Sequence, residues 1–522
     1  MAWRCRGLLT LLLVVVSCQR RDPVTQLIAG LDDSTGREEA IHGLTLLVEK
    51  APPEQRERLR EKVVIALTEA YREDESRPEI VTALCTLRDP RAEPVFVAAI
   101  GDAHRGGSYF EAAVRAARAV GELRLKPALP EIIRALRKAI ASPREDRNTW
   151  LERALVHSLV QLGDPAAVEV LVEVLNGDPA RQDFYLSKMA ASALGELGGT
   201  RTIRPLVTSL SGSQHGLLLF EESRQALCHL GPTALPELLA AASRRDRRGQ
   251  PVENAGAALR VLADIAEPGT VPQLKGLARA KDPLEYRLAV AEAQIRSRRT
   301  EGEEALLAIL EDRDASLTAR RRAADLLGWY GSRASAKGVL EAACKGSGAL
   351  QTVLCWSGAL AFSRAAGPDG LQTFDTLIKA RPDEVTRGYL REYRPRLELV
   401  ARCEGAVDCL SAALQKGPDW RARERAALEL GGATPADDSD PGAISLLLAR
   451  AFPAAHAQVQ EAILVALERR GPTREVAAEV ADRLRRGSVR HEAAGSPGPP
   501  PAVTSRALCA SQAWRRRSGE RR

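Results

Sequence analysis

A pattern that returns about every 35 residues constrains the fold of this chain more than any other feature of the sequence. Six segments align with one another, and the separations between their first residues are 36, 39, 35, 33 and 35. The first residues are Leu87, Leu123, Leu162, Leu197, Leu230 and Ile265. A period of this length accommodates two helices of about 12–15 residues and two short turns. One such unit cannot bury its apolar face alone, so we expect neighbouring units to stack.

The unit around residue 160 illustrates the helical pattern. Residues 151–163 (LERALVHSLVQLG) carry Leu and Ala at spacings of three and four, which predicts an amphipathic helix. Gly163 is suited to end that helix, because glycine readily adopts left-handed backbone angles. Asp164 and Pro165 are suited to begin the next one, as an N-cap and a first-turn proline.

The segment 191–210 (ASALGELGGTRTIRPLVTSL) resembles the A-L-G-x-L-G-D-P-x-A-x-x-x-L pattern of HEAT repeats, particularly the short type also found in phycobilin-lyase-like proteins. The resemblance covers residues 22–486. It implies an all-α fold, an alpha-solenoid superhelix of about 12 HEAT-type helical pairs. It further implies a long concave face, and HEAT arrays are mostly scaffolds and adaptors.

The first 17 residues have the organisation of an export signal. Arg4 and Arg6 precede an uncharged apolar run from Leu8 to Val16 that only Thr10 interrupts. A helix of this length spans far less than the roughly 30 Å hydrocarbon core of a bilayer. The segment is therefore too short for a transmembrane helix, and it fits the apolar region of a secretory signal peptide.

The residues Val15-Val16-Ser17-Cys18 resemble the lipobox of bacterial lipoproteins. The resemblance implies that Cys18 is the lipidation site and becomes the first residue of the mature chain, so that 18–21 form a tether. The covalent lipid is the only prosthetic group expected, and two or three acyl chains give stable anchoring. Gln19 implies the outer membrane, by the sorting rule of enteric bacteria. The alternative is an ordinary signal peptide with an incidental cysteine.

The net charge of +7 comes from the two ends of the chain. Residues 1–6 contribute two positive charges and residues 487–522 contribute five, so residues 7–486 sum to zero. A broad basic surface is the usual mark of a phosphate-binding protein. The charge distribution therefore argues against nucleic acid as a partner of the repeat region.

Residues 487–522 differ in composition from the rest of the chain. They are rich in Pro, Gly, Ser and Arg, and they lack apolar periodicity. This composition predicts a disordered basic tail. Its functional alternative is an arm that binds a polyanion or a membrane surface.

None of the nine cysteines forms a C-x-x-C pair, which argues against a zinc or thioredoxin-like motif. Cys85 and Cys228 fall on apolar helix faces and are expected to be small core residues. Cys403 and Cys409 are six residues apart across a glycine. In an oxidising compartment they can pair as a local disulfide.

No catalytic or metal-binding set is evident in the sequence. The seven histidines are scattered, and the sequence contains no Walker A, G-x-S-x-G or H-E-x-x-H motif. The repeated His-Glu pairs of HEAT-like di-iron hydroxylases are absent, since the single His-Glu dipeptide is His491-Glu492 in the tail. We therefore expect no catalytic residues, no metal and no enzymatic activity, although residues from distant repeats can still converge on the concave face.

Four tryptophans and two longer loops are weaker candidates for contacts. Trp150, Trp329, Trp356 and Trp420 lie inside helices or at helix starts, and packing between repeats is favoured over a role as ligand anchors. The loops at 104–110 and 211–216 lengthen two units, and insertions in repeat arrays often lie on the binding face.

Together these features predict a membrane-anchored scaffold or adaptor that binds a protein partner on its concave face at the cell envelope. Two alternatives remain from the sequence. One is an enzyme accessory of the lyase-like type, and the other is a polyanion or membrane-surface binder that acts through the tail.

Overall fold

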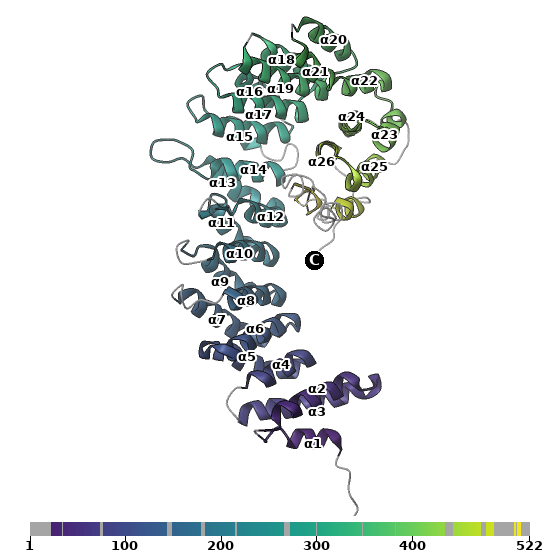
Figure 1. Ribbon diagram of the computed structural model, residues 1–522. Coiled ribbons are helices and arrows are strands. Elements are labelled where there is room, and N and C mark those ends of the chain that lie inside the picture. The colour runs from purple at the N-terminus through teal and green to yellow at the C-terminus, as the bar shows by residue number, and fades with distance from the viewer. Residues whose placement is uncertain are drawn as a thin grey trace, which may run out of the picture. The chain divides into compact units, whose positions relative to one another are not determined.

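The computed structural model describes residues 22–33, 35–73, 77–142, 149–178, 183–214, 217–265, 272–298, 300–346, 348–381, 383–433, 442–470, 477–484, 506–507 and 509–512 (Figure 1). The signal at 1–17, Cys18 and the tether at 18–21 lie outside these residues. The chain divides into two compact units, Met1–Ala167 and Val168–Arg522.

Unit 1 consists of consecutive helices joined by short turns. Its elements are α1 (Pro23–Ala29), α2 (Arg37–Lys50), α3 (Pro53–Glu73), α4 (Pro78–Leu87), η1 (Pro90–Ala92), α5 (Glu93–Gly101), η2 (Asp102–Arg105), α6 (Gly107–Glu122), η3 (Lys126–Ala128), α7 (Leu129–Ala141), α8 (Thr149–Leu162) and η5 (Pro165–Ala167).

Unit 2 continues the helical pattern. Its elements are α9 (Val168–Leu175), α10 (Phe184–Leu197), α11 (Thr200–Ser209), β1 (Ser213–Gln214), β2 (Leu217–Leu218), α12 (Phe220–Leu230), η6 (Gly231–Ala234), α13 (Leu235–Ser243), α14 (Ala255–Ile265), η7 (Pro272–Leu274), α15 (Leu284–Arg296), α16 (Thr300–Glu311), α17 (Leu317–Tyr330), α18 (Arg333–Cys344), α19 (Ala349–Ala365), α20 (Gly370–Ala380), α21 (Glu384–Arg391), α22 (Arg394–Cys403), α23 (Val407–Lys416), α24 (Trp420–Gly432), α25 (Ala443–Ala451), η8 (Phe452–Ala454) and α26 (Ala457–Arg470). Residues 477–484, 506–507 and 509–512 are also helical.

The helices form two layers in each unit, which confirms the predicted all-α solenoid of HEAT-type pairs. In unit 1, α2, α4, α6 and α8 pack side by side in one layer, while α3, α5 and α7 form the other. In unit 2, the inner layer is α10, α12, α14, α15, α17, α19, α22, α24 and α26. The apolar core lies between the two layers along the length of each unit. Two strands of two residues each, β1 and β2, form an antiparallel hairpin that connects α11 to α12.

The predicted helix boundaries at residues 163–165 are confirmed. Gly163 follows the end of α8 with φ +65°, a backbone angle that favours glycine. The Asp164 carboxylate then accepts a hydrogen bond from the backbone N–H of Ala166 at 2.9 Å, and Pro165 opens η5. The same arrangement recurs at Asp89, whose carboxylate caps η1 through the backbone N–H of Arg91.

Glycines inside the inner helices explain the A-L-G pattern of the repeats. A Cβ built on Gly195 of α10 would lie 2.6 Å from the Cα of Ala226 on α12. Equivalent close approaches join α6 to α8, α17 to α19 and α24 to α26, at Gly121–Ser158, Gly328–Ala361 and Gly431–Ala466. Only a residue without a side chain lets adjacent backbones pack this closely. The glycine of each motif is therefore a packing residue.

The alignment of residues 265–278 with the other repeats predicts that this segment contains the second helix of a repeat, and this prediction was wrong in part. Among the described residues of the segment, the structure has the end of α14, the three-residue η7 and a turn. Gly276 adopts φ +71°, which breaks a right-handed helix directly after Leu274.

The expectation of disorder across residues 487–522 was wrong for residues 506, 507 and 509–512, which are helical, and of these all but Gln512 are buried. A disulfide joins Cys509 to Cys228 of α12, 281 residues earlier in the chain. Because the stabilising partners lie so far away in sequence, local composition gave no sign of this segment's order. Within unit 2, α26, the last helix of the inner layer, also contacts α17 of the same layer (Figure 1).

Candidate functional site

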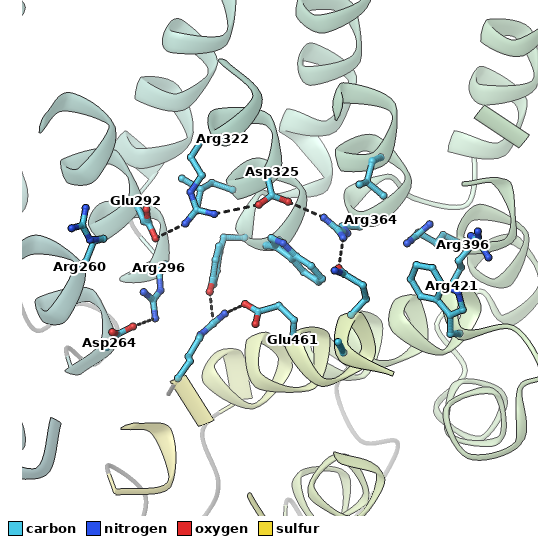
Figure 2. Close-up of a pocket in the computed structure, with 18 of the residues that line it drawn as sticks. Arg260, Asp264, Glu292, Arg296, Arg322, Asp325, Arg364, Arg396, Arg421 and Glu461 are labelled. Atoms are coloured by element: carbon cyan, nitrogen blue, oxygen red, sulfur yellow. Dashed lines mark hydrogen bonds and ion pairs between the residues drawn. The ribbon is translucent and has the colours of Figure 1, made fainter. Parts of the chain in front are cut away.

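The inner layer of unit 2 and Arg506 of the C-terminal segment line an open cavity of about 690 Å³, which we call the inner cavity. Side chains from α12, α14, α15, α17, α19, α22, α24 and α26 line it, together with Arg506. Among the described residues, the lining contains eight arginines and six carboxylates. Figure 2 shows Arg260 and Asp264 at one end and Arg396 and Arg421 at the other.

At the first end, a buried ion-pair chain links three consecutive inner helices. The Asp264 carboxylate of α14 lies 2.6 Å from Arg224 Nε of α12 and 2.7 Å from Arg296 Nη2 of α15. Burial alone would raise the pKa of Asp264, but Arg296 and Arg224 outweigh it and hold that pKa below its usual value. The carboxylate is therefore ionised at neutral pH and ties the helices together.

Arg506 connects the C-terminal segment to the same region. Its guanidinium donates to Glu468 at 2.6 Å, and it also contacts Glu461 and the Tyr330 hydroxyl. Burial opposes the charged form, but Glu461 and Glu468 raise the pKa of Arg506 well above its ordinary value. This arginine is thus a buried cation paired with two carboxylates.

The middle of the inner cavity is crossed by Arg322 and Arg364. Arg322 pairs with Glu292 at 2.9 Å and with Asp325 at 3.3 Å. Arg364 donates to Asp325 at 3.0 Å (Figure 2). Its guanidinium carbon lies 3.6 Å above the centre of the Trp329 ring. Since both arginines share Asp325, the charges form a continuous network across α15, α17 and α19.

At the second end, Glu424 of α24 is shared by two arginines. Its side chain is fully buried and accepts from Arg364 Nε at 2.6 Å and from Arg396 Nε at 3.2 Å. Arg396 Nη2 also contacts it. Burial lowers the pKa of Arg396 below its ordinary value, although Glu424 opposes that effect. The attraction of one shared carboxylate therefore does not fully offset the burial of this guanidinium.

A second cavity, of about 980 Å³, also has Tyr330 and Arg364 in its lining. Arg298, Arg333, Arg469 and Arg470 line it as well. Most of these guanidiniums are occupied by backbone carbonyls or by carboxylates. Arg469 donates to the carbonyl of Trp329 at 2.6 Å, and Arg333 pairs with Glu429 at 2.7 Å. These contacts join α26 to α17 and α18 to α24.

The cysteines are mostly paired. The structure joins Cys403 to Cys409, Cys344 to Cys355, and Cys228 to Cys509 as disulfides. The expectation of a small core residue was therefore incomplete for Cys228, which is buried but covalently linked. Cys85 is free, and burial raises its pKa to about 12, so its thiol is protonated at neutral pH.

A potential ligand set lies beside the inner cavity. Cys228, Cys509 and Asp264 bring one ligand atom each within 4.8 Å of one another. Metal binding by cysteine requires a free thiolate, and the disulfide consumes both sulfurs. This cluster is consequently a covalent link in the oxidised protein.

The four tryptophans occupy different environments. Trp329 is buried, as packing predicts, while Trp150 is 61% exposed. Trp356 stacks on Tyr389 with ring centres 4.5 Å apart, and Trp420 stacks on His456 at 4.4 Å. Trp329 and Trp420 both line the inner cavity, a role that their sequence positions did not indicate.

The two predicted loops take different forms. Residues 104–110 form the end of η2 and the first turn of α6. Residues 211–216 include β1, and 215–216 lie outside the described residues. The described residues of these two segments are not part of the inner-cavity lining.

No family model matches the sequence, and no curated protein matches it either. Solved structures similar to the chain include the complex of CpcE and CpcF of phycocyanin lyase from Nostoc sp. PCC7120, at 18% identity and a TM-score of 0.24. That match covers 58% of this chain and 94% of the other. Importin beta matches at 14% identity and a TM-score of 0.36, over 93% of this chain and 68% of the other.

Kap121p bound to Ste12p matches at 12% identity with a TM-score of 0.45. The match covers 93% of this chain, which spans 60% of the Kap121p chain. These proteins are built as HEAT-type helical arrays, and at such scores the likeness carries no inference about activity or partners. Among the described helices, none is long and apolar enough to cross a membrane.

Proposed function

We propose that this protein is an exported, lipid-anchored helical-repeat scaffold that binds a protein partner at the cell envelope. The observation that carries the proposal is an array of HEAT-type helical pairs that contains three disulfide crosslinks. Such arrays present extended surfaces suited to protein contacts. The scaffold has no enzymatic activity in this proposal.

The disulfides support export. Six of the seven cysteines that follow Cys18 are paired. Disulfides persist in oxidising compartments such as the periplasm or the cell surface, and they are rare in the cytosol. This pairing agrees with the signal-like residues 1–17 and with the lipobox that ends at Cys18.

Membrane fractionation tests the anchor. In cells that express the full chain, the wild-type protein is expected in the membrane fraction, and the Cys18→Ala variant is expected to move out of it. The acyl chains on Cys18 supply the binding energy, so their loss should release the protein. Retention of Cys18→Ala in the membrane fraction contradicts the anchor.

An exposed aromatic on α21 is the preferred place to test for a protein partner. Tyr389 is 46% exposed and packs on Trp356, and Val385 lies one helical turn before it with 66% exposure. Exposed tyrosines are enriched in protein interfaces. A photo-crosslinking residue at Tyr389 should therefore give a discrete adduct in intact cells.

The matched control carries the same crosslinker at Lys337 of α18, whose side chain is 78% exposed. Lys337 pairs with Glu341 of its own helix, and no partner is proposed for this surface. A crosslinker placed there therefore measures adducts that arise from random collisions. Equal adduct patterns at both positions would argue against a partner on α21.

The tail alternative has less support. Arg506, one of the arginines that gave residues 487–522 their positive charge, is buried and paired with Glu468. It is therefore not available to a polyanion.

A further inference from the structure

The second end of the inner cavity contains a guanidinium with one hydrogen-bond donor left over. Arg396 of α22 is 1% exposed and lines the cavity. Its Nε and Nη2 are engaged by Glu424, while Nη1 is buried and has no hydrogen-bond partner among the described residues. A buried donor without an acceptor is unfavourable, so an acceptor supplied by a ligand would stabilise the protein.

Among the described residues, Arg396 has a share in only one carboxylate. Glu424 serves both Arg364 and Arg396, whereas Arg364 has a second carboxylate partner, Asp325, at 3.0 Å. The charge of Arg396 is therefore compensated less fully than that of Arg364. The neighbouring Arg421 is neutralised by Glu392 at 2.7 Å. Glu392 and Asp325 also line the cavity, and they would repel a dianion such as phosphate more strongly than a monoanion.

Aromatic rings form the walls beside this donor. The guanidinium carbon of Arg396 lies 5.3 Å from the centre of the Trp420 ring and 5.9 Å from that of Tyr393. Trp420 is held in place by its stack on His456. Trp329 and Leu360 add further apolar surface to the lining. An apolar or aromatic group can pack against these walls while a carboxylate reaches Arg396.

The cavity has the size of a small-ligand site. Its volume of about 690 Å³ falls within the range of roughly 300–1,000 Å³ that is typical of ligand pockets. The disulfide between Cys228 and Cys509, together with the contacts of Arg506, holds the C-terminal segment beside it. The site is thus built from rigid helices and a covalent link.

We propose that the inner cavity binds a monoanionic carboxylate that carries an apolar or aromatic group. Arg396 Nη1 donates to the carboxylate, and Trp420, Tyr393 and Trp329 surround the apolar part. The carboxylate belongs either to a small molecule or to the C-terminus of a peptide chain. This proposal does not depend on the lipid anchor or on the partner proposed for α21.

Calorimetry with the detergent-solubilised full chain tests the proposal with a matched pair of probes. N-acetylphenylalanine and its amide differ in the charge of one group. The acid is expected to bind one site per chain, at least tenfold more tightly than the amide. Equal affinities for acid and amide, or no binding of the acid, would overturn the proposal.

A peptide arm distinguishes the two sources of the carboxylate. A hexapeptide ending in phenylalanine is compared as its free acid and as its C-terminal amide. Tighter binding of the peptide acid than of N-acetylphenylalanine identifies a chain end as the ligand, and weaker binding identifies a small molecule. In both cases amidation should weaken binding at least tenfold.

Two variants locate the site. Arg396→Lys keeps a cation beside Glu424 and removes Nη1, so it should weaken binding of the acid at least tenfold. The matched control is Arg204→Lys on α11, an exposed arginine that pairs with Glu237 at 3.1 Å and is not part of the cavity lining, and it should bind as the wild type does.

Circular dichroism establishes whether each variant folds. A folded Arg396→Lys variant with wild-type affinity would overturn the assignment. If Arg396→Lys fails to fold, Trp420→Leu at a half-buried position replaces it, and unchanged binding of the acid to that variant would contradict the site.

Discussion

At the scale of single residues, the glycines of the inner helices decide how closely the repeats stack. Gly195, Gly328 and Gly431 each face a small residue on the next inner helix of unit 2. The A-L-G pattern could be found in the sequence because it recurs with the repeat. The packing role of these glycines could be recognised only in the structure, since the residue that each glycine contacts lies one full repeat further along the chain.

Gly195→Ala is expected to destabilise the protein. The added methyl group would lie 2.6 Å from the Cα of Ala226, which forces the two helices apart. Overpacking of this kind costs about 1–3 kcal/mol. Chemical denaturation followed by circular dichroism measures the change.

Gly256→Ala on α14 is the control, because nothing lies within 4 Å of the corresponding Cβ. There the gain in helix propensity should stabilise the protein by roughly 0.5–1 kcal/mol. A Gly195→Ala variant that is as stable as the Gly256→Ala variant would refute the packing role of Gly195.

At the scale of helices, buried ion pairs connect neighbours within the inner layer of unit 2. Asp264 joins α12 and α15 to α14, and Glu424 joins α19 and α22 to α24. Sequence analysis could predict the helices from their periodicity. It could not predict which charged residues face inward, because each pairs with a residue at least 28 positions away.

Asp264→Asn is expected to destabilise the protein at neutral pH. The substitution leaves Arg224 and Arg296 buried without their shared carboxylate, and removing one partner of a buried ion pair costs roughly 3–5 kcal/mol. Thermal unfolding at pH 7 measures the loss. Glu341→Gln, at an exposed carboxylate of α18, is the control and should change stability by about 0.5 kcal/mol or less.

Asp264 should also contribute to acid sensitivity. Its pKa is lowered in the folded state, so its stabilising contribution is present above the unfolded value of about 3.9 and is lost as the pH falls through the folded pKa. The difference in stability between wild type and Asp264→Asn should therefore shrink below about pH 4. A difference that stays constant from pH 7 to pH 3 would contradict the ion-pair assignment.

At the scale of the whole molecule, the C-terminal segment of unit 2 is the feature that the sequence concealed. The repeat period predicted the solenoid, and the resemblance to HEAT repeats implied a long concave face. In unit 2, α26 also contacts α17 of the same layer, and Arg506 joins the inner helices in lining a cavity. Composition predicted disorder for residues 487–522, and it could not show that Arg506 and Cys509 make stabilising contacts with the distant helices α12, α17 and α26.

Removing the long-range disulfide is expected to destabilise unit 2. The double variant Cys228→Ser, Cys509→Ser should lose about 2–4 kcal/mol, because a crosslink over a long loop restricts the unfolded chain strongly. Its cysteines are 281 residues apart. The control is Cys344→Ser, Cys355→Ser, which spans 11 residues and should lose less. A larger loss in the control would show that loop length does not govern these disulfides.

The disulfide between Cys228 and Cys509 holds the C-terminal segment beside the inner cavity, and it also supports the proposed export of the chain. The most direct measurement is non-reducing peptide mapping by mass spectrometry, after free thiols have been alkylated in intact cells. A crosslinked peptide pair containing Cys228 and Cys509 is expected, while Cys85 should be alkylated slowly in the folded protein, because its thiol is half-buried and burial raises its pKa to about 12. Alkylation of Cys228 and Cys509 as separate free thiols would contradict both the attachment of the C-terminal segment beside the cavity and an oxidising location.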